Sequence, residues 1–303
     1  MDSPTETLLG REQWQELARE HAAAVDGLTA GRLERRRRGE RHPVEDFLFE
    51  YYNHPPAKLR RWHPGPGVRL ADAAEPYGDR SGYVLAADGS AVLDSAAFLE
   101  RRGRAVTFVR DLLEATLSRP GTHDCFGLHE WAMVHRLAPG EQRHEQLPLR
   151  LGQAGTDEVV EGHRIRCSHF DAYRFFTEAA APRNTLRPTR ETQLEHEQPA
   201  CLHAGMDVYK WAFKLAPAVP SELTLAAFRH ALRVRELDMA ASPYDLSDLG
   251  IAPVAIETAT GKAEYVTRQR ELMVASNALR RRLLAVIEDL RVAAGLPHVV
   301  GGR

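Results

Sequence analysis

The stretch RCSHFDAYRFF places a carboxylate, Asp171, between two side chains that can orient it, His169 and Tyr173. In an extended segment these three side chains lie on one face, while Phe170 and Arg174 lie on the other. A carboxylate held in this way can position a water molecule and accept its proton. We therefore expect Asp171 to act as the general base of an active site. An aspartate hydrogen-bonded into a turn is the structural alternative.

Glu130 offers a second carboxylate, within the stretch HDCFGLHEWAMVHR. The apolar repeat predicts a helix over 128–137, on which Trp131 and His135 share a face. A glutamate on a partly apolar helix keeps its proton more readily, as a general acid requires, although a salt-bridged glutamate fits the pattern equally well. His129 and His135 are six residues apart, which excludes the HExxH zinc motif. We expect Glu130 to be the alternative catalytic carboxylate.

A third stretch, CLHAGMDVYKWAFK, predicts a helix over about 200–216. His203 and Asp207 are four residues apart on this helix, and Lys210 and Trp211 follow one turn later. These side chains could line a polar pocket with an aromatic wall; a solvated Asp207–Lys210 pair beside a core Trp211 is the alternative. Across the three stretches, the residues predicted to bind a substrate are Trp131, His169, Tyr173, Arg174, His203, Asp207, Tyr209, Lys210 and Trp211.

Between Phe47 and His63, aromatic rings are interleaved with the cations Lys58, Arg60 and Arg61. Rings stack on bases and cations hold phosphates, so this mixture is typical of a nucleic-acid groove. We expect the three cations to contact a nucleic-acid backbone. The alternative is a half-buried helix followed by a solvated basic loop.

Histidines recur through the same stretches and allow a metal enzyme instead. Imidazole and carboxylate groups are ligands of zinc and of non-haem iron, and in a helical fold they can converge from several helices. No spacing among them is diagnostic, so the first expectation is an enzyme without a cofactor. The candidate ligands of iron or zinc are His123, His129, His135, His169 and His203.

The composition limits the class of protein. The chain has 303 residues, with 40 Lys+Arg, 42 Asp+Glu and a formal net charge of −2. This excludes a globally basic nucleic-acid coat, so a DNA contact has to be a local basic patch. The three cysteines form no CxxC pair, which favours a reducing cytoplasm. The first residues do not read as a signal peptide, and no apolar run reaches the ~18 residues of a membrane span. We expect a cytoplasmic protein with no membrane partner.

The elements that must position these residues are mostly helices, and no βαβ alternation supports a doubly wound sheet. We predict a mainly α fold (α-dominated α+β): one helical domain over 1–303 with a minor β hairpin or short strands. A peripheral N-terminal helix lies within 1–41 and a flexible tail covers 294–303. The predicted helices cover 11–38, 44–52, 95–118, 128–137, 200–216, 220–240 and 261–293, and the predicted strands 83–85, 91–93, 159–167 and 254–256.

The chain resembles a family of actinobacterial proteins commonly labelled 3-methyladenine DNA glycosylase. The resemblance runs from about His42 to Arg270 and rests on motifs that include HPVEDFLFEYY, CFGLHEWAMV, IRCSHFDAYRFFT and EQPACLHAGMDVYKWAFKLAP. It implies a DNA-repair hydrolase that cleaves the N-glycosidic bond of an alkylated purine. Such an enzyme needs base extrusion, a stacking pocket and a carboxylate, which Asp171 or Glu130 would supply.

Two other functions fit the same residues. One is a metal-dependent helical enzyme, with iron or zinc, that acts on a small molecule or a nucleoside. The other is a helical module that binds a nucleotide or small ligand without catalysis. The near-neutral charge lowers the expectation of a long DNA footprint and leaves room for a small-molecule substrate.

Overall fold

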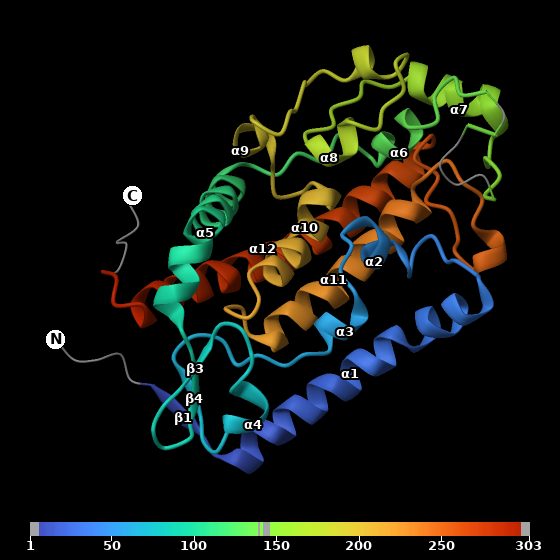
Figure 1. Cartoon of the computed structure of the whole chain (residues 1–303). Coiled ribbons are helices and arrows are strands. Elements are labelled where there is room, and N and C mark those ends of the chain that lie inside the picture. The colour runs from blue at the N-terminus through green and yellow to red at the C-terminus, as the bar shows by residue number, and fades with distance from the viewer. Residues whose placement is uncertain (1–5, 139, 142–145, 298–303) are drawn as a thin grey trace. The chain divides into compact units, whose positions relative to one another are not determined.

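Helices form at most of the positions that the apolar repeats predict (Figure 1). A computed structural model describes residues 6–138, 140–141 and 146–297. This part of the chain contains twelve α-helices and one four-stranded sheet, which confirms the predicted mainly α class with minor β structure. None of these helices combines the length and the apolar character that a membrane crossing needs. The longest are α1 (Arg11–Arg38), α5 (Ser95–Ser118), α10 (Leu202–Lys214), α11 (Ser221–Ala240) and α12 (Ala259–Ala293).

The described residues form two compact units. Unit 1 combines the chain up to Leu113 with Tyr209–Arg229 and the residues from Leu279 onward, whereas unit 2 combines Glu114–Val208 with His230–Ala278. The helices α5, α10, α11 and α12 each contribute residues to both units. The single domain over 1–303 stays a prediction, and the predicted tail at 294–303 extends beyond the described residues.

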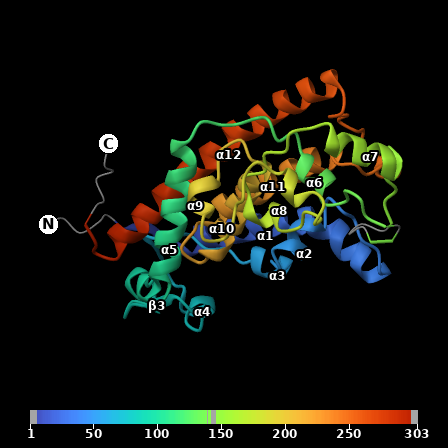
Figure 2. The same cartoon turned by 90° about the horizontal axis from the view of Figure 1, so that it is seen from above.

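Unit 1 contains the small sheet, in the strand order β1-β2-β4-β3. Strands β3 and β4 pair antiparallel with Tyr83 opposite Leu93, which confirms the hairpin predicted around Asp88-Gly89. Strand β1 pairs parallel to β2, and neither was predicted, because three residues are too few to show an alternating pattern. Helix α4 lies beside β3 in both views (Figures 1 and 2). The bounds are β1 Thr7–Leu9, β2 Val68–Leu70, α4 Ala74–Tyr77, β3 Tyr83–Leu85 and β4 Ala91–Leu93.

A loop in unit 1 is fixed to the first turn of α11. The His63 backbone N–H donates to Ser221 Oγ (2.8 Å), and the Trp62 indole N–H donates to Glu222 Oε1 (2.7 Å). Gly65 has φ +91°, and a Cβ there would lie 2.6 Å from Pro220 Cγ, so only glycine allows this approach. Two short helices, α2 (Phe47–Tyr51) and α3 (Pro56–Leu59), precede the loop.

Unit 2 consists of short helices and segments of the long ones. Glycine at position 205 lets α10 approach α12 closely, because a Cβ there would lie 2.9 Å from Ser276 Oγ. The short helices are α6 (Leu128–Ala132), α7 (Gly152–Glu161), α8 (Phe170–Tyr173) and α9 (Gln193–His196), and α6 lies beside α7 (Figure 1).

Three local predictions in unit 2 need correction. The helix predicted over 128–137 ends at Ala132. The strand predicted over 159–167 is wrong, because α7 continues to Glu161; Val159 and Val160 are both buried, which a helix allows and an alternating strand does not. The extended reading of 169–173 is also wrong. The His169 carbonyl accepts the N–H groups of residues 172 and 173 and starts α8.

The first testable prediction concerns the acid stability of unit 1. Burial, with the nearby charges of Arg80 and Arg61, lowers the pKa of His63 to about 4. Because the unfolded pKa is about 6.5, folding favours the neutral ring, so stability is complete above pH 6.5 and falls as the pH drops toward 4, by about 3 kcal/mol. His63→Gln should remove most of this pH dependence, measured by urea unfolding at pH 4, 5 and 7. An equal loss in both proteins would contradict it.

Candidate metal centre

Three buried side chains of unit 2 converge from separate elements. His169 precedes α8, Glu197 follows α9, and Asp207 lies on α10; each is at most 2% exposed. His169 Nε2 lies 3.3 Å from Glu197 Oε1 and 3.4 Å from Asp207 Oδ2, yet forms no hydrogen bond with good geometry. Ligand atoms about 2.0–2.1 Å from a tetrahedral ion stand about 3.3 Å apart. The two distances from His169 Nε2 therefore match those of a metal site, and all three ligand atoms lie within 4.8 Å of one another.

Neighbouring groups hold Glu197 in place. Its Oε1 accepts a hydrogen bond of 2.5 Å from Gln193 Nε2, one turn earlier in the chain. Its backbone carbonyl accepts a hydrogen bond of 2.8 Å from the Arg119 guanidinium. Hydrogen bonds of this kind orient metal-binding carboxylates in many proteins. Gln193 and Arg119 therefore fix both ends of the residue.

The protonation of His169 reflects the two carboxylates. Burial by itself favours the neutral ring, but the facing side chains of Asp207 and Glu197 raise the pKa of His169 to about 9. The ring is therefore protonated at neutral pH when no other cation lies between the carboxylates.

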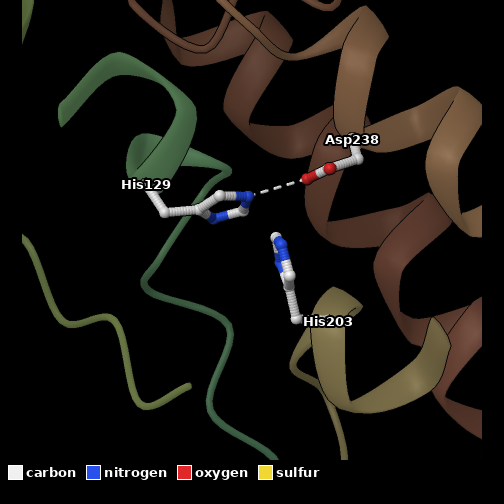
Figure 3. Close-up of side chains that lie close together, drawn as sticks. All are labelled: His129, His203 and Asp238. Carbon is white, nitrogen blue, oxygen red and sulfur yellow. Dashed lines mark hydrogen bonds and ion pairs between the residues drawn. The ribbon is translucent and has the colours of Figure 1, made fainter. Parts of the chain in front are cut away.

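A second group of possible ligands, His129, His203 and Asp238, lies next to the first. His129 Nε2 and Asp238 Oδ1 are 2.8 Å apart, and Figure 3 shows the ring of His203 pointing toward this hydrogen bond. The His203 ring centroid is 4.6 Å from that of His129 and 5.3 Å from that of His169. His203 Nδ1 is buried and has no hydrogen-bond partner. His203 thus connects the two groups.

Arg235 ties the second group to helix α6. Its Nη1 donates to Asp238 Oδ2 (2.6 Å) and to Glu130 Oε1 (2.7 Å), and all three side chains are buried. Burial opposes a charged His129, but Asp238 raises the pKa of that ring; burial and the neighbouring His129 lower the pKa of His203. The second group is thus an internally paired network in which His203 stays neutral.

A cavity of about 10 Å³ is lined by His129 and His203 of the second group and by none of His169, Glu197 and Asp207. This volume is about that of one water molecule. Ser168 and Gln198, the chain neighbours of His169 and Glu197, line it together with His129, His203 and the cysteines Cys125, Cys167 and Cys201. Burial raises the pKa of the Cys201 thiol to about 12, and that of Cys167 is also raised, so both thiols stay protonated.

The predicted catalytic carboxylates have different surroundings. Glu130 is buried in the ion pair with Arg235, whereas the side chain of Asp171 is 15% exposed and lies 3.2 Å from the Arg174 guanidinium. Trp131 is fully buried and its indole N–H donates to the Ala241 carbonyl. The Tyr173 hydroxyl donates to the Ala181 carbonyl at 3.4 Å. The structure thus places Glu130 and Trp131 in the core of unit 2.

The predicted pocket on α10 is divided between the units. His203 and Asp207 belong to unit 2, whereas Tyr209, Lys210 and Trp211 belong to unit 1. Tyr209 is fully buried against Phe228 and other rings, and Lys210 Nζ lies 4.6 Å from the Trp211 ring centroid.

Two of the predicted metal ligands fall outside both groups. His135 is buried with Nε2 3.4 Å from Glu161, and His123 is half-buried and belongs to neither group. The predicted backbone contacts are in unit 1, where Lys58 and Arg61 line a pocket and Arg60 pairs with Asp26 at 2.8 Å.

Sequence reasoning missed Glu197 and Asp238. The signal for Asp238 was available, because Arg235 and Asp238 continue the apolar stripe that includes Ala231 on α11, where charged residues are rare. Glu197 lies between a four-residue helix and Pro199, so no periodic pattern indicates its direction.

Comparisons with known proteins give no information on the function of this site. No family model, curated protein or solved structure matches the chain.

The second prediction tests the Arg235 network. Arg235→Met leaves Glu130 and Asp238 buried with fewer partners, and breaking a buried ion pair costs about 3–5 kcal/mol. We expect a loss of this size in urea unfolding at pH 7. The matched control is Arg268→Met, which removes an exposed pair with Glu264 and should cost less than about 1 kcal/mol. Similar losses in the two variants would contradict the prediction.

Proposed function

We propose that this protein is a metal-dependent enzyme whose ion is held by His169, Glu197 and Asp207. One observation carries the proposal. A fully buried imidazole nitrogen faces two buried carboxylate oxygens at 3.3 and 3.4 Å without hydrogen-bond geometry to either. Ligand atoms around a shared ion stand at this spacing, about 3.3 Å apart.

The charge of the group also supports an ion. The raised pKa of His169 indicates that a positive charge is favoured where its ring faces the carboxylates of Glu197 and Asp207. A divalent ion with a neutral imidazole balances them fully, and buried charges in proteins are paired or coordinate metals. The metal replaces the proton on His169 as the partner of both carboxylates.

The ligand set favours zinc or non-haem iron. One imidazole and two carboxylates are a nitrogen and oxygen set that both ions accept, and the tetrahedral spacing favours zinc. Three protein ligands leave a position for water, and a metal in such a site makes bound water a nucleophile near neutral pH. His203, with its unpartnered Nδ1, lies beside His169, and the water-sized cavity is lined by His203 and by Ser168 and Gln198, the chain neighbours of two of the proposed ligands. This arrangement suits hydrolysis of a small molecule or nucleoside.

The third prediction is metal content. The protein purified without added metal should contain about one equivalent of zinc or iron per chain, measured by elemental analysis. His169→Ala should lose the metal, and Gln193→Leu, which keeps all three ligands, should lower the affinity by about 10–100-fold. The control is His123→Ala, whose ring belongs to neither group, and it should keep the metal. A folded wild-type protein that binds neither Zn²⁺ nor Fe²⁺ would overturn the proposal.

A second candidate is hydrolysis of the N-glycosidic bond of an alkylated purine, which the resemblance implies. It is favoured by Asp171, a carboxylate that remains 15% exposed beside Arg174. This reaction needs a carboxylate that substrate or water can reach, to stabilise the oxocarbenium ion or activate water.

The fourth prediction tests this candidate. If it is right, the protein releases free 3-methyladenine from alkylated DNA, and Asp171→Asn lowers the rate at least about 100-fold with folding retained. Asp124→Asn, which changes an exposed carboxylate paired with Arg166, is the matched control. Absence of release from every lesion tested would exclude the glycosylase. Release that survives removal of the metal would separate it from the metal-dependent reaction.

A further inference from the structure

Unit 1 contains a pocket that the metal centre does not use. Its volume is about 520 Å³, within the range of small-molecule sites. The lining comes from three parts of the unit: residues 52–63, the pair Ser81 and Arg102, and residues 213–224.

The pocket is strongly positive. Lys58, Arg61, Arg102 and Lys214 line it, and no aspartate or glutamate does. Lys58, Arg61 and Arg102 form no ion pair with a carboxylate in the part of the chain that the structure describes. A protein with net charge −2 thus gathers cations on one concave surface. A concave surface of one sign concentrates ligands of the opposite sign.

Three aromatic rings stand in a row at the same pocket. His54 stacks on Phe213 with ring centroids 3.8 Å apart, and Tyr52 stacks on the other side at 5.5 Å. All three line the pocket, and Tyr52 and Phe213, at the two ends of the row, are partly exposed. Aromatic rings of this kind stack on nucleobases, which adds about 1–3 kcal/mol per base.

The cations, and not the helix start, provide the anion site. Ser221 and Thr224 from the first turn of α11 also line the pocket. However, the Ser221 N–H donates to the His63 carbonyl, and the Thr224 N–H donates to the Pro220 carbonyl. These backbone donors are already used, so a phosphate has to be held by the lysine and arginine side chains.

We propose that this pocket binds a nucleotide, with the phosphate on Lys58, Arg61 and Arg102 and the base on the row of rings. The ligand is one nucleotide and not a long strand, because the pocket has the volume of a small-molecule site and most of the basic run upstream is paired. Arg35 pairs with Glu45 and Asp46, and Arg37 and Arg38 pair with Glu34. Three of the four arginines of this run, Arg35, Arg37 and Arg38, are therefore already paired with carboxylates.

The experiment measures binding of AMP, adenosine, inorganic phosphate and a 12-nucleotide single strand by calorimetry on the full chain. AMP should bind at least tenfold more tightly than adenosine or phosphate alone, because each of these lacks one half of the recognition. Arg61→Gln and Phe213→Leu should each weaken AMP binding at least tenfold.

Arg60→Gln is the matched control. Arg60 is next to Arg61 in the sequence, but its guanidinium pairs with Asp26 and does not line the pocket. This variant should leave AMP affinity unchanged. Loss of AMP binding in Arg60→Gln equal to that in Arg61→Gln would overturn the proposal, as would no AMP binding by the wild-type protein. A strand that binds more than 100-fold more tightly than AMP would overturn the assignment to a single nucleotide.

Discussion

Ionised carboxylates are costly to bury, and unit 2 buries Glu130, Glu197, Asp207 and Asp238. Each of them needs an oppositely charged partner at hydrogen-bond or ion-pair distance. Arg235 pairs with Glu130 and Asp238 from α11, while His169 lies between Glu197 and Asp207. The positions of α6, α8, α10 and α11 are coupled through these contacts, because a shift of any of them would leave a charge without its partner.

The two carboxylate pairs differ in how completely they are compensated. Nη1 of Arg235 carries two hydrogens and donates one to each of its two carboxylates in short hydrogen bonds. Nε2 of His169 carries at most one hydrogen and faces two oxygens without hydrogen-bond geometry to either, while Gln193 donates to Glu197 Oε1. The contrast separates a group that stabilises the fold from a group suited to a ligand. It also explains why histidines that look alike in the sequence have different roles.

The long helices could be predicted from the sequence because their apolar repeats extend over several turns. The hairpin of β3 and β4 could be predicted because Asp88-Gly89 favours a tight turn. The interior of unit 2 could not, since its short helices are fixed by tertiary hydrogen bonds. His169 illustrates this: its local pattern predicted an extended segment, but its carbonyl starts α8. The i and i+4 spacing of His203 and Asp207 did predict that both lie on one face of α10. Both are buried, His203 in the group with His129 and Asp238, and Asp207 in the group with His169 and Glu197. Their partners Glu197 and Asp238 come from segments far away in the sequence.

Gly205 links the packing of α10 against α12 to the positions of His203 and Asp207. It lies on α10 midway between His203 and Asp207, where a Cβ would meet Ser276 Oγ of α12 at 2.9 Å. Ligand distances in a metal site tolerate deviations of only about 0.2 Å. A Cβ at this position would force either Ser276 or the helix that carries both residues to shift. Packing against α12 therefore restricts position 205 to glycine and fixes the segment of α10 that carries His203 and Asp207.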